Sequence, residues 1–191
     1  MSEINLYFRL GIEHILAIDS FDHILFVIAL CVAYPLSMWR QILILVTAFT
    51  IGHSLTLALA TFRIVIIDVD FIEFLIPITI LITSVGNFIT KPEVGKNILY
   101  HSKYLIALIF GLIHGLGFSN YLILLLNPDE KLFIPLGSFN IGVEAGQIII
   151  VIAFGIITWF FTIICKIKHE IWSNIVSATV AVTAFFLLLK Q

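Results

Sequence analysis

The sequence is poor in charged residues. Only 12% of its 191 residues are charged, compared with about 25% in an ordinary soluble domain. The net charge of −2 provides no basic surface for a nucleic acid, so no nucleic-acid partner is predicted. In their place the chain has 61% hydrophobic residues and a mean hydropathy of +1.15. This composition predicts an all-α protein that crosses a membrane several times and contacts lipid.

Cysteine is also scarce. Cys31 and Cys165 lie in or at the end of apolar runs, and they provide neither a disulfide framework nor a zinc knuckle. The N-terminal stretch MSEINLYFRL lacks the basic start and apolar core of a cleavable signal peptide. We therefore expect the first membrane helix to act as its own insertion signal.

Long apolar runs dominate the rest of the chain, and about 20 such residues are enough to span a bilayer as a helix. Six spans are expected, at approximately Phe21–Trp39, Gln41–Phe62, Phe71–Thr90, Lys103–Leu126, Pro135–Cys165 and Ile171–Leu189. Leu6–Ile18 is predicted to be a short helix that lies at the membrane interface or dips into it, because it is too short and too polar to span. Pro35 should bend or break the chain after the first span, and Lys91–Lys103 should be a loop. Residues 1–191 are predicted to form a single transmembrane domain.

The basic residues are distributed unevenly between the two sides of these spans. The loops after spans one, three and five hold six of them, and the opposite side holds four: Arg40, Lys91, Lys96, Lys103, Lys166 and Lys168 against Arg9, Arg63, Lys131 and Lys190. Because cytoplasmic loops are enriched in lysine and arginine, both termini are predicted to lie outside the cytoplasm. The sequence leaves the oligomeric state open, and a homo-oligomer is compatible with it.

The ionisable and amide residues that precede, open or lie within the spans fall at one level, between the outer surface and the midplane. Six of them are predicted metal ligands, namely His14, Asp22, His23, His53, His114 and Glu144. Four more are predicted to surround the ligands, namely Asp19, Glu73, Asn140 and Gln147. An ionisable residue in a span costs about 2.5–3.5 kcal/mol, which is tolerable if several of them share a cation. Imidazoles and carboxylates without a nearby thiolate suit a divalent transition metal such as zinc, nickel or cobalt.

Each motif also has a simpler structural explanation. Asp22 can cap a helix beside an interfacial histidine. Thr47 and Thr50, in TAFTIGHSL, lie on one helical face and can form interhelical hydrogen bonds. Gly111 and Gly115, in GLIHGLGF, have the spacing of closely packed membrane helices. A metal site is favoured by the convergence of several such motifs at one depth.

Four motifs in this order resemble the HupE/UreJ family of small bacterial membrane proteins: GIEHILAIDSFDHILF, TAFTIGHSLTLALA, GLIHGLGF and FNIGVEAGQ. The resemblance implies about six helices in the inner membrane and a role in nickel or cobalt uptake. The family's histidine and Asp-His motif would correspond to His14, Asp22 and His23. The intervening segment Ile15–Phe21 is two residues longer than in the better-known nickel-permease branch. The chain therefore resembles a divergent branch, for which the fold is implied but nickel specificity is not.

Three classes of function are compatible with these residues. The leading hypothesis is a metal-ion transporter for nickel, cobalt or zinc. The alternative is a zinc-dependent intramembrane hydrolase with an outward-facing active site, in which Glu144 or an aspartate acts as general base on a zinc-bound water. A haem protein with paired histidines ranks third, because nearby carboxylates suit a harder ion.

Overall fold

The computed structural model describes residues 2–17, 20–89, 98–125 and 132–190, and every regular element in these ranges is a helix. The longer helices are α1 (Glu3–Leu16), α2 (Phe21–Val32), α3 (Trp39–Thr61), α4 (Val69–Ile89), α5 (Ile98–Gly117), α6 (Ser119–Leu125), α7 (Phe133–Trp159) and α8 (His169–Leu189). A short 3-10 turn, Leu36–Met38, precedes α3, and a π-helical turn, Phe160–Ile164, follows α7. The predicted all-α architecture is confirmed.

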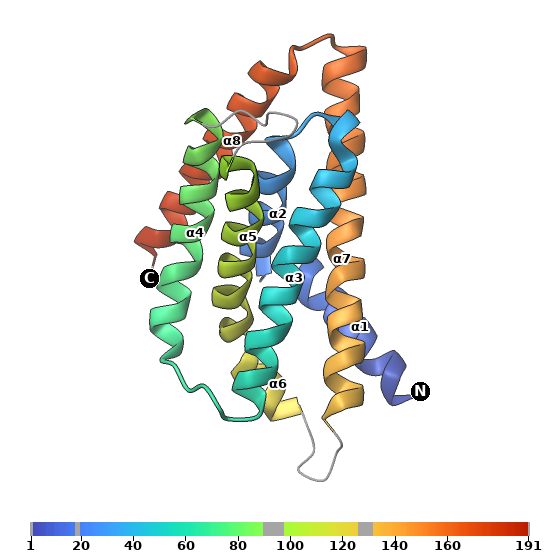
Figure 1. Ribbon diagram of the computed structural model, residues 1–191, viewed down its shortest axis with the longest axis vertical. Coiled ribbons are helices and arrows are strands. Elements are labelled where there is room, and N and C mark those ends of the chain that lie inside the picture. Colours follow the sequence, from blue (N-terminus) through green and yellow to red (C-terminus); the bar gives the residue numbers. More distant parts are fainter. Residues whose placement is uncertain (1, 18–19, 90–97, 126–131, 191) are drawn as a thin grey trace.

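The helices form an elongated bundle around α2 (Figure 1). Three pairs pack along each other, α3 with α5, α1 with α7 and α4 with α8, and α2 contacts α1, α3, α4, α7 and α8. Most side chains of α2 are buried, including Leu25, Phe26 and Val27. Large apolar side chains such as Ile152 (58% exposed) and Phe186 (63% exposed) cover the outside of the bundle. This distribution suits a bundle surrounded by lipid.

Four described helical segments are long and apolar enough to cross a membrane: Leu36–Thr61, Val69–Ile89, Phe133–Ile164 and His169–Leu189. The count rises to five if α1 and α2 together form one broken span. The described apolar part of α5, Ser102–Gly117, is shorter. A multi-pass membrane protein is therefore supported, whereas the count of six spans stays a prediction.

The first predicted span ends earlier than expected. Helix α2 stops at Val32, and Pro35 is extended, with ψ 154°. A proline disfavours helical geometry in the residue before it, so the predicted break at Pro35 is confirmed. The predicted loop Lys91–Lys103 is wrong in its second half, because α5 begins at Ile98. Lys103 thus belongs to a helix, and residues 90–97 lie outside the described ranges.

Helix α1 differs most from its prediction. Tyr7, Gly11, His14 and Ile15 are buried, and α1 packs along α7 instead of standing apart at the interface. The α1 and α2 axes meet at 72°. In Figure 1, α1 leads from the lower end to the middle of the bundle, and α2 continues from there towards the upper end. The prediction of an interfacial N-terminal helix is not confirmed, since α1 and α2 resemble two halves of one broken span.

Candidate metal centre

Three histidines from three helices converge inside the bundle. His14 lies near the end of α1, His23 in the first turn of α2 and His53 in the second half of α3. The ring centroid of His14 lies 4.7 Å from that of His23 and 5.8 Å from that of His53, and the His23 and His53 centroids are 5.8 Å apart. One nitrogen from each ring can be chosen so that all three lie within 4.8 Å of one another. We call these three residues the histidine cluster.

A fourth imidazole lies next to the histidine cluster. The ring centroid of His114, near the end of α5, is 5.3 Å from that of His23. Its Nδ1 donates a hydrogen bond to the Phe110 carbonyl at 2.8 Å. With the proton on Nδ1, Nε2 keeps a free lone pair, which is the form of imidazole that binds a metal. From the sequence, His114 is expected near the centre of its span. In the structure α5 ends at Gly117, so His114 lies near the C-terminal end of this helix.

Each of these four residues has at least one buried ring nitrogen without a hydrogen-bond partner. His53 and His114 are fully buried, and His23 and His14 are 4% and 8% exposed. The unpartnered nitrogens are Nε2 of all four residues and Nδ1 of His23 and His53. Buried polar groups normally have partners, and each one without a partner costs about 1–3 kcal/mol. Four imidazoles with such nitrogens in one place are therefore available to a ligand, and three of them could hold a metal ion.

Glycines hold the helices of the cluster together. A Cβ added to Gly111 would lie 2.1 Å from the Phe49 carbonyl oxygen, and one added to Gly115 would lie 2.2 Å from the carbonyl oxygen of His53. On the other side of the bundle, a Cβ on Gly11 would lie 2.1 Å from the Phe139 carbonyl oxygen. The α3 and α5 backbones therefore touch, as do those of α1 and α7. The close packing predicted for Gly111 and Gly115 is confirmed, and it fixes the register of His53 against His114.

A cavity of about 440 Å³ leads to the cluster. His14, His23 and His114 form part of its wall, and Asp22 and Glu73 bring carboxylates to it. Asp22 Oδ2 lies 3.3 Å from His23 Nδ1. Because this carboxylate is on the Nδ1 side of the ring, it can orient His23 so that Nε2 faces the cluster.

Sequence reasoning missed the contribution of Pro77 to this cavity. Pro77 lies inside α4 and in the cavity wall, one turn after Glu73. Proline has no N–H, so the Glu73 carbonyl lacks its usual helical donor. A proline within an apolar run was the available signal for this feature. The proline therefore interrupts the hydrogen-bond ladder of α4 next to the cavity.

Comparison with protein families gives a match over the whole chain. The family model described as HupE / UreJ protein covers residues 1–191. The chain belongs to the HupE/UreJ family. This family is associated with nickel and cobalt transport, and the resemblance stated from the sequence motifs is confirmed. No curated protein and no solved structure matches the chain.

His14, Asp22 and His23 meet where α1 and α2 approach each other. All three line the same cavity, although the segment between His14 and Asp22 includes residues 18–19, which lie outside the described ranges. The predicted site residue Asp19 falls there. The seven residues between His14 and Asp22 thus do not prevent His14 from reaching the Asp-His pair.

The candidate residues of α7 contact α3 instead of the cluster. The Thr47 hydroxyl donates to Glu144 Oε1 at 2.8 Å, and the Thr50 hydroxyl donates to Gln147 Oε1 at 2.6 Å. The interhelical hydrogen bonding predicted for the two threonines is confirmed. Asn140, one turn before Glu144, is half-buried, and its Oδ1 has no hydrogen-bond partner. The structure therefore brings together the histidines and Asp22, and it places Glu144 and Gln147 in a separate polar contact.

Proposed function

We propose that this HupE/UreJ protein is a permease for a divalent transition metal in the bacterial inner membrane, with nickel, cobalt or zinc as its cargo. The observation that carries the proposal is the convergence of His14, His23 and His53, each of which has a buried Nε2 without a hydrogen-bond partner. Nitrogen ligands suit these borderline ions better than magnesium or calcium, which prefer oxygen. His114 Nε2 is the nearest candidate for a fourth ligand.

The spacing of the cluster fits such an ion after a small adjustment. Two ligands held at about 2.0–2.1 Å from a tetrahedral metal ion are about 3.4 Å apart, and the cluster nitrogens lie within 4.8 Å of one another. A contraction of about 1.5 Å by side-chain rotation would close the site. Glu144, predicted from the sequence as a further ligand, would have to leave its bond to Thr47 in order to join.

The negative charge of Asp22 is proposed to orient the His23 ring for metal binding, and a substitution can test this role. Asp22→Asn should weaken metal binding by about 10- to 100-fold, because the amide keeps the shape of the side chain but loses the charge that orients His23. Isothermal titration of the purified protein in detergent measures the dissociation constant. The control is Glu73→Gln, which removes an exposed carboxylate from the same cavity and should change the constant by less than about threefold. An equal loss in both variants would contradict a specific role for Asp22.

The path to the cluster begins at the cavity that contains Asp22 and Glu73. Carboxylates in a cleft raise the local concentration of a cation. Broken helices that meet near the middle of the membrane are a common way for transporters to build ion sites, and α1 and α2 have this arrangement. In our proposal α1 with α2 forms one of six crossings, and the others are α3, α4, α5 with α6, α7 and α8.

The cavity is proposed to face the outside of the cell, with both termini on that side. The charge bias of the loops supports this orientation. Cys165 gives a direct check, because it is exposed at the other end of the bundle, between α7 and α8, whereas Cys31 is buried. An impermeant thiol reagent should not label Cys165 in intact cells and should label it in inverted membrane vesicles.

Reconstitution separates a carrier from a metal-dependent hydrolase. Liposomes loaded with a metal-sensitive dye should give a signal when Ni²⁺, Co²⁺ or Zn²⁺ is presented outside. The initial rate should fall by at least about tenfold in His114→Ala if this histidine helps to hold the ion. Zinc that stays bound through purification, with no flux in the wild-type protein, would contradict the carrier and favour hydrolysis.

A further inference from the structure

Helices α2, α3 and α5 carry the same series of side chains, which starts at the metal centre and leads away from it. Each carries a histidine, then a phenylalanine about one turn away, then an aliphatic residue one turn further: His23, Phe26 and Leu30 in α2; His53, Phe49 and Leu45 in α3; His114, Phe110 and Ile106 in α5. Helices α3 and α5 run opposite to α2 (Figure 1). Because a turn rises by about 5.4 Å, the three helices present their histidines, phenylalanines and aliphatic residues at matching levels.

The middle level is a packed aromatic layer. The ring centroid of Phe26 is 4.8 Å from that of Phe49 and 6.0 Å from that of Phe110. The His114 ring lies 5.1 Å from both Phe26 and Phe49. Phe26 is fully buried and Phe49 is 1% exposed. These rings fill the interior of the bundle next to the histidines, on the side of the aliphatic level.

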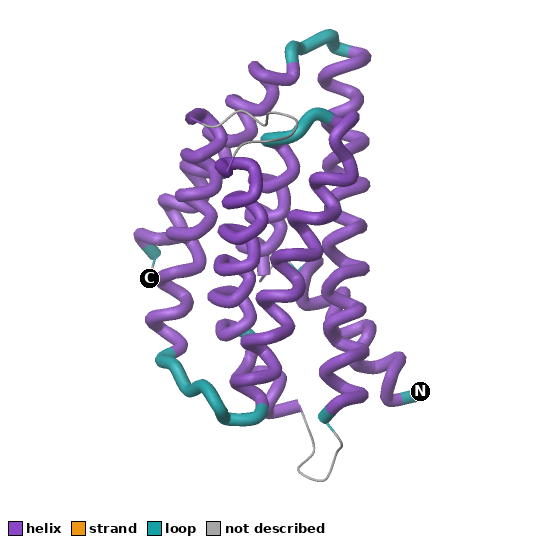
Figure 2. The backbone as a smooth tube through the Cα atoms, in the orientation of Figure 1, coloured by secondary structure: helices purple, strands orange, loops and turns teal. Residues whose placement is uncertain are grey.

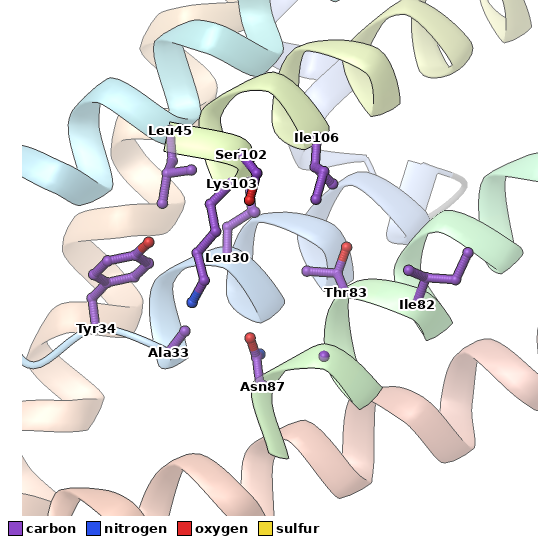
Figure 3. A pocket seen from close by; sticks show the side chains of 11 residues that line it. Leu30, Ala33, Tyr34, Leu45, Ile82, Thr83, Asn87, Ser102, Lys103 and Ile106 are labelled. Atoms are coloured by element: carbon purple, nitrogen blue, oxygen red, sulfur yellow. The ribbon is translucent and has the colours of Figure 1, made fainter. Parts of the chain in front are cut away.

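A second cavity, of about 210 Å³, lies beyond the aromatic layer. All three aliphatic residues of the outer level, Leu30, Leu45 and Ile106, line it. Figure 3 shows Lys103 reaching across this cavity from α5 and Asn87 pointing into it from α4. The Lys103 ammonium lies 5.3 Å from the Tyr34 ring centroid. Most of the lining residues come from the later parts of α2 and α4 and the earlier parts of α3 and α5. Figure 1 and Figure 2 show these parts of the helices in the upper half of the bundle, whereas α2 begins lower.

We propose that this cavity is the exit chamber of the metal path and that Phe26, Phe49 and Phe110 are the barrier between it and the metal centre. The inference rests on the proposed transport function. A path needs tight binding on one side and weak binding on the other, so that the ion can leave. The chamber meets the second requirement, because its wall is mostly apolar and the Lys103 ammonium has no lone pair to offer a metal ion. Ions would therefore enter from the side of Asp22 and Glu73 and leave past Lys103.

Gly86 allows the chamber to be filled without disturbing the histidines. It lines the cavity, and a Cβ added there would meet no atom within 4 Å. We expect Gly86→Leu to lower the initial rate of Ni²⁺, Co²⁺ or Zn²⁺ flux into dye-loaded liposomes by at least about tenfold. Gly86→Ala should have a smaller effect. Equilibrium binding of the same ions should stay within about twofold of the wild type in both variants.

Gly137→Leu is the matched control. Gly137 is also a helical glycine with nothing within 4 Å of an added Cβ, but it is exposed on α7 and does not line the chamber. It should leave both flux and binding unchanged. If the wild-type protein carries metal and Gly86→Leu carries it equally fast, the exit chamber is wrong while transport stands. If the wild-type protein binds metal without any flux, the transport proposal itself fails. If Gly86→Leu loses binding as well as flux, the chamber is not separate from the metal centre and the inference is overturned.

Discussion

His53→Ala is expected to weaken the binding of Ni²⁺, Co²⁺ and Zn²⁺ by at least about 100-fold. Removing even an outer partner of a metal ligand costs about 10- to 100-fold, and His53 is proposed as a direct ligand. It is fully buried, and neither ring nitrogen has a hydrogen-bond partner. No neighbouring carboxylate or thiolate completes the group of ligand atoms among the described residues. Titration of the purified protein with each metal measures the effect.

A second histidine provides the control for this variant. His169 is the first residue of α8 and lies outside the histidine cluster. His169→Ala also removes one imidazole, but outside the histidine cluster. It should leave the dissociation constant for the metal within about twofold of the wild type. Equal affinity in the wild type and in His53→Ala would show that the cluster does not hold the ion.

Gly111→Ala is expected to destabilise the bundle, although alanine is the better helix former. The exchange gains about 1 kcal/mol of helix propensity. However, the new Cβ would lie 2.1 Å from the Phe49 carbonyl oxygen and 3.1 Å from the His53 amide nitrogen. Overpacking of this kind costs about 1–3 kcal/mol, and more where backbone must move. We expect a net loss of about 2 kcal/mol and a melting temperature lower by about 4–8 °C.

Thermal unfolding in detergent measures this effect, and Gly137→Ala is its control. Gly137 has open space around its Cα, so alanine there should leave the melting temperature unchanged or raise it. Metal affinity should fall in Gly111→Ala, because α3 and α5 have to separate and His53 then moves away from His114. A Gly111→Ala protein as stable as the Gly137→Ala protein would contradict the close backbone contact between α3 and α5.

Hydropathy predicted most of the fold, and its failure at α1 has a physical cause. Segments such as Val69–Ile89 are recognisable because their length and apolar content match a bilayer. Helix α1 contains Glu3, Arg9 and Glu13 and therefore looks interfacial. One face of α1 is buried because Gly11 has no side chain, which allows the backbone of α7 to come into contact. A hydropathy scale measures polarity and does not show such a contact. Packing partners of this kind become visible only in three dimensions.

The sequence predicted the level in the membrane at which the site residues lie, but it did not predict which neighbouring helix each side chain meets. Counting along the spans places His14, His23, His53 and His114 at one level, and the structure brings their rings together. The same count places Glu144 and Gln147 on one face of their helix. It does not reveal which neighbour that face meets, and the neighbour is the threonine pair of α3. The proposed ligand set is therefore richer in histidine than the sequence alone indicated.

X-ray absorption at the metal edge of the loaded protein tests the histidine cluster most directly. The proposal predicts a first shell of nitrogen or oxygen atoms at about 2.0–2.1 Å, with the multiple-scattering pattern of three imidazoles from His14, His23 and His53. His23→Ala should remove one imidazole from that pattern. A shell of water and carboxylate oxygens without imidazole scattering, or a spectrum that His23→Ala leaves unchanged, would contradict metal binding at the histidine cluster.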